Sequence, residues 1–148
     1  MEAVVFMGLP ASGKSSFYKE RFFSTHVRIN LDLLKTRHRE LLLLEACLQT
    51  KQRFVIDNTN PTRADRSRYI KAAKTARLDV VGYYFQSVIE ECLKRNEIRS
   101  ETERVHDVAV LSIATKLELP SFDEGFDQLF YVQIKSGEFV IEEWNEEI

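Results

Sequence analysis

Short apolar runs alternate with longer amphipathic segments along most of the chain. The runs are rich in β-branched and aromatic residues, and each ends at a glycine or a polar residue, as buried strands commonly do. We predict strands at residues 3–7, 26–29, 53–56, 80–85 and 128–134, then a small hairpin containing Gly137 and residues 139–141. We predict helices at residues 14–23, from Asn30 as N-cap to about Leu48, and at residues 61–77, 88–97 and 106–118.

This alternation predicts an α/β fold in which right-handed crossovers place helices around a parallel central sheet. Ligands of such sheets bind at the carboxyl ends of the strands. No repeat or linker divides the 148 residues, so we expect a single domain spanning 1–148. One long helix is expected after Asn30, with Pro61 as the first residue of the next. The apolar face of that long helix would comprise Leu31, Leu34, Leu41, Leu44 and Leu48.

Composition and charge narrow the class of protein. Hydrophobic residues make up 44% of the chain and charged residues 30%, as in ordinary folded proteins. The formal net charge is -2, so a nucleic acid would have to be bound by a local basic cluster. The longest apolar run is Leu41 to Leu44, so we expect no membrane partner. Cys47 and Cys92 lie far apart and no export leader is visible, which favours a cytoplasmic location.

The loop after the first predicted strand carries a phosphate-binding motif. The segment from Gly8 to Ser15 matches G-x-x-x-x-G-K-[ST]. Its glycines allow backbone amides to converge on phosphates at the positive end of the following helix. We expect Lys14 to reach the β and γ phosphates of ATP, and Ser15 to bind Mg²⁺. The residues expected to contact the nucleotide in this loop are Gly8, Pro10, Ala11, Ser12, Gly13, Lys14, Ser15 and Ser16.

The segment from Gly8 to Ser15 is called the P-loop below, and other segments distinguish among the classes of protein that contain such a loop. GTP-binding switches read guanine with an Asn-Lys-x-Asp segment, and this chain contains no Asn-Lys pair. Hydrolytic ATPases commonly place a glutamate beside the aspartate that ends a neighbouring strand, whereas Asn58 follows Asp57 here. Both differences favour a small kinase, in which water is excluded and a substrate hydroxyl is the nucleophile.

Two aspartates at predicted strand ends are candidates for the chemistry. Asp32 follows the second strand in the first turn of a helix, where a carboxylate can act as general base. The alternative is a helix-start carboxylate that only complements the helix dipole. Asp57 ends the third strand, where it can support the metal or orient Ser15. Its alternative is an Asx turn that leads into Pro61.

Arginines and lysines are expected around the phosphates. Arg95 and Arg99 are four residues apart near a helix end, so both can project from one face toward ATP, or simply complement the helix C-terminus. Further cations are expected at the rim of the site, where they either contact substrate phosphates or form an ordinary solvated surface. These cations are Arg28, Lys35, Arg37, Arg39, Arg63, Arg66 and Arg68.

Four segments together resemble the 5′-hydroxyl polynucleotide kinase domain of phage and of animal DNA end-repair enzymes. They keep the family's order over about residues 3–134, and the string Ile-Asp-Asn-Thr-Asn-Pro is the most specific part. The segments are the P-loop, Ile29-Asn30-Leu31-Asp32, Val55-Ile56-Asp57-Asn58-Thr59-Asn60-Pro61 and Arg95-Asn96-Glu97-Ile98-Arg99. The resemblance implies a P-loop kinase fold with a lid segment. It also implies that Asp32 is the base and that Arg99 in the lid contacts ATP, while Asp57 supports the metal.

The same resemblance implies that the acceptor is the 5′-OH end of DNA or RNA. Lys35, Thr59, Asn60 and Arg63 would then lie on the substrate side, with Asp32, Lys14 and Arg99 as the catalytic residues. Leu31 stands where the family commonly has arginine, which removes one cation from this region. A phosphatase or ligase domain often accompanies this kinase, and any role in nucleic acid repair is expected to involve other proteins.

Two other functions are compatible with the same motifs. One is a P-loop kinase of a small hydroxylated molecule, such as a sugar acid, a nucleoside or an antibiotic, because only the acceptor pocket separates it from a polynucleotide kinase. The other is a nucleotide-dependent binding module that does not turn over a substrate. Transfer of labelled phosphate to 5′-OH oligonucleotides or to small alcohols distinguishes the two kinases, and ATP consumption with and without acceptor separates both from the binding module. The oligomeric state is left open.

Overall fold

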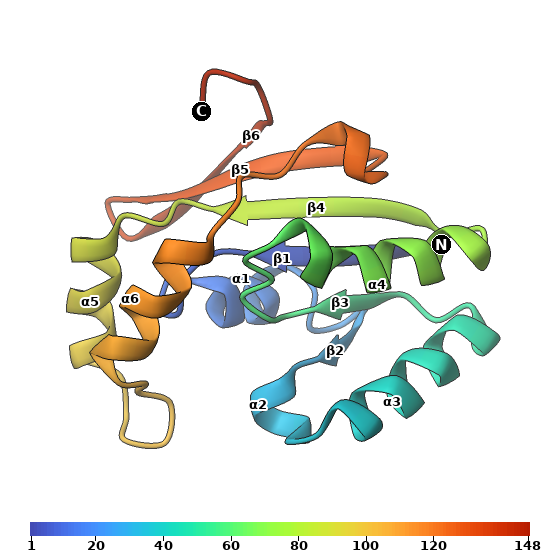
Figure 1. Ribbon diagram of the computed structural model, residues 1–148, viewed down its shortest axis with the longest axis horizontal. Helices are drawn as coiled ribbons and strands as arrows, with labels where there is room; N and C mark the ends of the chain where they lie inside the picture. Colours follow the sequence, from blue (N-terminus) through green and yellow to red (C-terminus); the bar gives the residue numbers. More distant parts are fainter.

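A six-stranded sheet runs through the molecule in the order β2-β3-β1-β4-β5-β6, as seen in the computed structural model, which describes residues 1–148 (Figure 1). Neighbouring strands are parallel except for β5 and β6, which form an antiparallel hairpin. The strands are β1 (Glu2–Met7), β2 (Val27–Ile29), β3 (Phe54–Ile56), β4 (Asp79–Phe85), β5 (Gln128–Lys135) and β6 (Glu138–Glu143). The predicted parallel sheet and terminal hairpin are therefore both confirmed.

Six α-helices and one 3₁₀ turn connect these strands. None of the helices is long and apolar enough to cross a membrane. The helices are α1 (Lys14–Arg21), α2 (Leu31–Leu34), α3 (Arg37–Thr50), α4 (Arg63–Thr75), α5 (Ile89–Glu97) and α6 (Asp107–Lys116), and the 3₁₀ turn is η1 (Phe122–Glu124). Their positions follow the predicted helices, with the exceptions described next.

The predicted long helix after Asn30 is interrupted. Lys35 has a φ of 74°, which ends α2 after one turn, and the Thr36 side chain then caps α3 by accepting a hydrogen bond from the backbone N–H of Arg39. Leu41 is 50% exposed and is therefore not part of a continuous buried face. The break separates the turn that carries Asp32 from the helix that packs on the core.

Pro61 is not the first residue of the following helix. Thr62 is the N-cap of α4, and its side chain accepts a hydrogen bond from the backbone N–H of Asp65, so the helix begins at Arg63. Sequence signals for helix starts placed this boundary two residues early.

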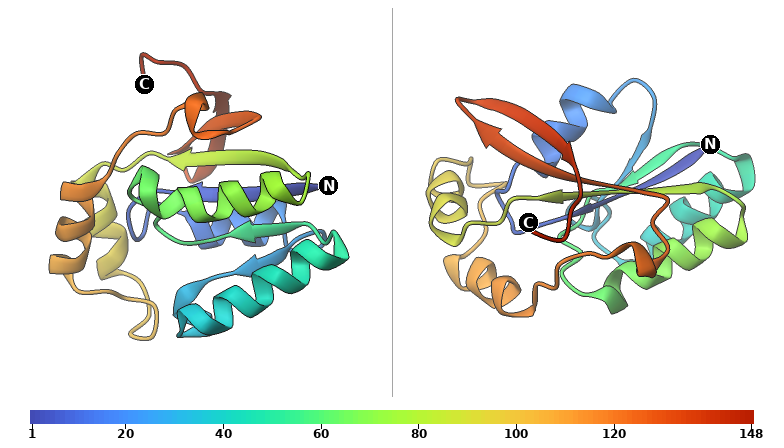
Figure 2. Two further views of the ribbon diagram at one scale, coloured as in Figure 1. Left: turned by 45° about the vertical axis from the view of Figure 1, so that its right-hand side comes forward. Right: turned by 90° about the horizontal axis from the view of Figure 1, so that it is seen from above.

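The two faces of the sheet are covered by different helices. Side chains of β1 alternate between them: Ala3, Val5 and Met7 pack with α3 and α4, whereas Val4 and Phe6 pack with α1. Figure 2 shows α1 and α4 on opposite sides of the sheet. Because both faces are covered, the central strands are almost wholly buried, which explains their continuous apolar sequences.

The carboxyl ends of the parallel strands form one edge of the molecule. In Figure 1 this edge lies at the left, where α5 and α6 stand side by side beyond the end of β4. The P-loop after β1 leads into α1 at the same edge, and α2 follows β2 there. The fold thus brings the predicted nucleotide loop, the Asp32 turn and the lid segment to one end of the sheet.

A buried ion pair ties α4 to the segment before β5. The side chain of Arg66 is fully buried, and its Nε lies 2.8 Å from Glu124 Oε1. The guanidinium also donates hydrogen bonds to the carbonyl oxygens of Asn60 and Glu118. Arg66 was expected on a solvated rim, and this expectation is wrong. Its charge instead joins three connecting segments on one face of the sheet.

We predict that Arg66→Met destabilises the fold by about 3–5 kcal/mol, because the buried Glu124 carboxylate loses its close partner and keeps only Arg63, at 3.9 Å. Urea unfolding measures the change. Lys71→Met, on an exposed position of the same helix, is the matched control and should change stability by no more than about 0.5 kcal/mol. Equal stability of the two variants would show that the buried pair contributes nothing.

Candidate active site

The P-loop has a backbone that its glycines permit. Gly8 has a φ of 151° and Gly13 a φ of 105°, and Ala11 adopts a φ of 63° between them. A Cβ at residue 13 would lie 3.0 Å from Ile134 Cδ1 and 3.1 Å from a ring carbon of Phe139. A side chain there would therefore be strained by its backbone and crowded by the β5–β6 hairpin.

The beginning of α1 is suited to an anion. Gly13 is the N-cap and offers no side chain to bind the free amides of the first turn, and this turn contains no acidic residue. The helix dipole adds partial positive charge at the same place. Backbone N–H groups are thus available for a phosphate at the point where the motif predicts one.

Lys14 is a buried cation without a carboxylate in direct contact. Its Nζ donates hydrogen bonds to the carbonyl oxygens of Gly8 at 2.9 Å and Leu9 at 2.6 Å. Burial lowers the pKa of Lys14 from 10.5 to about 8, and the negative charge of Asp57 opposes that shift. A desolvated ammonium held only by neutral oxygens fits an anionic ligand such as a nucleotide phosphate.

Ser15, Asp57 and Arg28 form a second group beside the P-loop. The Ser15 hydroxyl donates to Asp57 Oδ2 at 3.1 Å, and Arg28 Nε donates to the same oxygen at 2.8 Å. Arg28 also donates to Ser15 Oγ at 3.0 Å. The geometry therefore brings Ser15 and Asp57 together, as the sequence suggested. Arg28, expected at the rim, lies within the site instead.

Asp32 is exposed on α2, and its side chain makes no hydrogen bond or ion pair. Its charge nevertheless raises the pKa of Lys14, while Arg99 acts in the opposite direction. Residues of α2 and of the segment after α5 are thus each within electrostatic range of Lys14. The charges of Asp32 and Arg99 thus both act on Lys14, and the catalytic roles of the three residues stay predictions.

The lid segment is held by Asn96, which is fully buried. Its amide donates to the carbonyl oxygen of Val105 at 2.6 Å and accepts from the Val105 backbone N–H at 3.1 Å. Arg95 lies 3.5 Å from the carbonyl oxygen of Ala11 and is paired with Glu91. Arg95 therefore reaches the P-loop, and Arg99 is half-buried just beyond the helix end.

Asparagines after β3 join the elements of the site, a role that the sequence analysis missed. Asn60 is buried, has a φ of 44°, and donates from its amide to the carbonyl oxygen of Phe6 at 2.8 Å. Asn60 was expected on the substrate side, but its side chain is buried and bound to the backbone at the end of β1. The carbonyl oxygen of Thr59 accepts a hydrogen bond from Gly8 N. The sequence signal for this role was the position of these amide side chains just after a wholly apolar strand, where a buried polar group needs hydrogen-bond partners.

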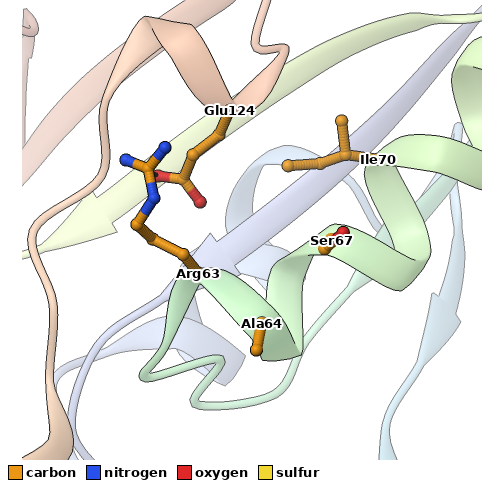
Figure 3. A pocket seen from close by; sticks show the side chains of 5 residues that line it. All are labelled: Arg63, Ala64, Ser67, Ile70 and Glu124. Carbon is orange, nitrogen blue, oxygen red and sulfur yellow. Dashed lines mark ion pairs between the residues drawn. The ribbon is translucent and has the colours of Figure 1, made fainter.

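The predicted rim cations divide into paired and unpaired groups. Arg63 contacts Asp123 at 2.9 Å and Glu124 at 3.9 Å, at one side of a cavity of about 280 Å³ between α4 and η1 (Figure 3). A substrate phosphate would have to compete with these carboxylates for Arg63. The cations paired with carboxylates are Arg28, Arg37, Arg63 and Arg66. Those without such a partner are Lys35, Arg39 and Arg68.

The lowered pKa of Lys14 predicts how nucleotide binding depends on pH. Below pH 8 the lysine is already protonated, so ATP affinity should be nearly flat. Above pH 8 a proton must be taken up when phosphates bind, and affinity should fall by about tenfold per pH unit. Calorimetric titration between pH 7.5 and 9.5 measures this. Lys14→Arg stays charged and should remove the dependence, and a flat profile in the parent would contradict the prediction.

Sequence relatives of the chain bear kinase names. The chain is 29% identical over 149 residues to the bifunctional polynucleotide phosphatase/kinase of Schizosaccharomyces pombe, covering 97% of this chain and 36% of that protein. It is 33% identical over 135 residues to an Acanthamoeba polyphaga mimivirus protein that bears the same name provisionally, covering 86% and 32% respectively. The chain thus spans about a third of the length of these relatives.

Solved structures share the fold at low identity. Chaetomium thermophilum Kti12, in complex with ADP-AlF3, superposes with a TM-score of 0.67 at 19% identity and 88% coverage of both chains. A sugar kinase from Janibacter sp. gives a TM-score of 0.68 at 15% identity, covering 90% of this chain and 85% of that one. The predicted P-loop kinase fold is confirmed.

The sequence relatives and a family profile together identify the family of this chain. The relatives confirm the resemblance to polynucleotide kinase domains. The sequence profile of the AAA domain family matches residues 4–120, most of the chain. Together with the P-loop geometry around Lys14, this match shows that the chain belongs to the AAA domain family of P-loop nucleotide-binding proteins.

Proposed function

We propose that the protein is a kinase that transfers the γ-phosphoryl group of ATP to the 5′-OH end of DNA or RNA. The observation that carries the proposal is the placement of Asp32. It is an exposed, unpaired carboxylate at the carboxyl end of the sheet, within electrostatic range of Lys14. A general base has to be accessible to the acceptor and near the phosphates, and the exposure of Asp32 and its influence on Lys14 support this role.

In this mechanism Asp32 accepts the proton of the attacking hydroxyl. The bond from the 5′ oxygen to the γ-phosphorus forms as the bond from that phosphorus to the bridging β-γ oxygen breaks, which leaves ADP. Lys14 and Arg99 offset the negative charge on the transferring group. The buried surroundings of Lys14 strengthen this effect, because charge interactions are screened less away from water.

Ser15 and Asp57 are the residues proposed to hold Mg²⁺. The structure has no cluster of three or more His, Cys, Asp or Glu side chains that could bind a metal alone. A P-loop site needs none, because one hydroxyl, the phosphates and water supply oxygen ligands. The Ser15 hydroxyl, oriented by Asp57, fits that requirement. Bound Mg²⁺ would neutralise phosphate charge.

The nucleic acid acceptor is supported by the named relatives and by local charge. Two relatives are named polynucleotide phosphatase/kinases. Lys35 follows Asp32 by one turn, is exposed, and has no carboxylate partner, so it is free to bind a substrate phosphate. Arg39 and Arg68 are similarly free of carboxylates. We propose that these cations bind the polynucleotide near its 5′ end.

A kinase of a small hydroxylated molecule is the second candidate. Leu31 and Leu33 lie on either side of Asp32, and Leu33 is 62% exposed, which gives the acceptor side an apolar component. Such a surface is suited to a small acceptor as well as to a nucleoside. A panel of 5′-OH oligonucleotides and small alcohols, assayed with labelled ATP, separates the two candidates. If no acceptor increases the consumption of ATP, the binding module is favoured instead.

We predict that Asp32→Asn lowers transfer to a 5′-OH oligonucleotide by about 10² to 10⁴, because an amide cannot accept the proton. ATP affinity and melting temperature should stay near those of the parent, since an amide is nearly isosteric and Asp32 has no partner to lose. Steady-state rates with labelled ATP measure the effect. Lys14→Ala is the reference variant, because it loses a cation that stabilises the transferring phosphate. Its transfer rate should also fall by at least about 10²-fold. A variant that keeps its rate within a few-fold would exclude Asp32 as base.

We also predict that the KM for a single-stranded oligonucleotide rises with salt, because phosphate contacts release counterions. Lys35→Glu should reduce the slope of log affinity against log salt by about 0.7 or more. Arg63→Glu is the control and should change the slope less, since Asp123 and Glu124 already offset the charge of Arg63. Equal slopes for all three proteins would argue against polynucleotide contacts at Lys35.

A further inference from the structure

The turn that carries Asp32 has little apolar packing. Helix α2 has four residues, none of them buried, and Lys35 ends it with a φ of 74°. The Asp32 side chain itself has no hydrogen-bond partner. Leu34 packs partly against the core at the end of the turn, so polar contacts of the backbone must hold the start of the turn, where Asp32 lies.

Two asparagines make those contacts. Asn30 caps α2 by accepting a hydrogen bond from Leu33 N at 3.0 Å, and it donates to the carbonyl oxygen of Asp57. Asn58 Oδ1 accepts a hydrogen bond from Leu31 N at 2.9 Å. Leu31 is the first residue of the turn and directly precedes Asp32, so Asn58 holds the backbone next to the carboxylate.

The orientation of Asn58 depends on a buried carboxylate. Glu40, on α3, is 3% exposed, and its Oε2 accepts a hydrogen bond from Asn58 Nδ2 at 3.1 Å. An ionised carboxylate can only accept, so it keeps the NH₂ group of Asn58 toward itself and leaves the amide oxygen for Leu31. The reversed amide would place oxygen against oxygen and nitrogen against an N–H group.

Tyr69 and Arg37 complete the cluster. The Tyr69 hydroxyl, on α4, donates to Glu40 Oε1 at 3.0 Å, and Arg37 donates to the same oxygen at 2.9 Å. Tyr69 is 1% exposed. Burial and the charge of Glu40 raise the pKa of Tyr69 to about 12, so its hydroxyl stays protonated and remains a donor at neutral pH. The cluster holds Glu40 between two helices.

We propose that Glu40 and Tyr69 are positioning residues for phosphoryl transfer, acting through Asn58 to hold the α2 backbone and hence the carboxylate of Asp32. The inference rests on the proposed role of Asp32 as base. Glu40 and Tyr69 touch neither nucleotide loop nor acceptor side, so their effect on the rate is indirect. Their polar atoms are used within the cluster, which extends from α4 and α3 to the first turn of α2.

Tyr69→Phe tests the proposal because it removes one hydroxyl and keeps the buried ring. We expect kcat for a 5′-OH oligonucleotide to fall by about 10- to 100-fold, as for a displaced catalytic group, while the KM for ATP is unchanged. Tyr18→Phe is the matched control. It also removes a buried hydroxyl, which donates to the carbonyl oxygen of His26 at 2.6 Å, and it should leave kcat near that of the parent.

A double-mutant cycle with Asp32→Asn separates positioning from general stability. If Tyr69 acts through Asp32, Tyr69→Phe should have little further effect on the rate of the Asp32→Asn variant. The same fold-loss in both backgrounds, or no loss in the parent, would overturn the proposal. An Asp32→Asn variant with nearly full activity would instead overturn the proposed function, so the two failures are distinguishable.

Hydrogen exchange provides a readout that does not depend on the acceptor. Tyr69→Phe should increase the exchange rate of the Leu31 amide, and Tyr18→Phe should not. Glu40→Gln should have a similar effect on Leu31, because a neutral amide no longer restricts the orientation of Asn58. Unchanged exchange at Leu31 in both Tyr69→Phe and Glu40→Gln would show that the cluster does not hold this backbone.

Discussion

The site depends on how the backbone groups at the ends of β1 and β3 are satisfied. These adjacent parallel strands end at the same edge, where the chain leaves the sheet and its N–H and C=O groups lose their strand partners. The loop after β3 supplies replacements: Thr59 accepts from Gly8 N, and the Asn60 amide donates to the carbonyl oxygen of Phe6. These bonds set the P-loop against the Asp57 loop, and with it Lys14 against Ser15 and Asp57.

Charge is distributed so that Lys14 keeps no direct anionic partner. Asp57 is buried and close enough to affect the pKa of the lysine, but its Oδ2 already binds Arg28 and the Ser15 hydroxyl. Arg28 thereby offsets the carboxylate that would otherwise compete with phosphate for the ammonium. The buried cation and the free amides of α1 remain directed at a common ligand position, which is the physical basis of nucleotide binding in this family.

The two sides of the site are held in different ways. The nucleotide side rests on packing, since Gly13 lies against Ile134 and Phe139, and the Phe139 ring is 5.0 Å from that of Phe17. The acceptor side rests more on hydrogen bonds from amides and on a buried carboxylate, because α2 has no fully buried side chain and only Leu34 packs partly against the core. The P-loop is therefore positioned by close packing, whereas the position of the acceptor side depends on a few polar contacts.

Local sequence was sufficient for much of this description. Continuous apolar runs identified the buried strands, because both faces of a parallel sheet are covered, and the glycines and Lys14 identified the phosphate loop. Asp57 directly follows a strand and Asp32 lies three residues after one, and both could be selected because carboxyl ends of parallel strands meet at one edge. The break at Lys35 was missed, since leucines continue across it and a positive φ at lysine leaves no mark in hydrophobic periodicity.

Only the tertiary structure decided which polar side chains are partners. Arg28, Arg63 and Arg66 are all arginines near strand or helix ends, yet one binds Asp57, one is half-exposed beside Asp123, and one is buried with Glu124. Likewise Glu40, Asn58 and Tyr69 are distant in sequence and meet through helix packing. Hydrophobic periodicity and motif spacing predict the role of a residue within its own helix, strand or loop. Partners across elements depend on distances that arise when the helices pack on the sheet.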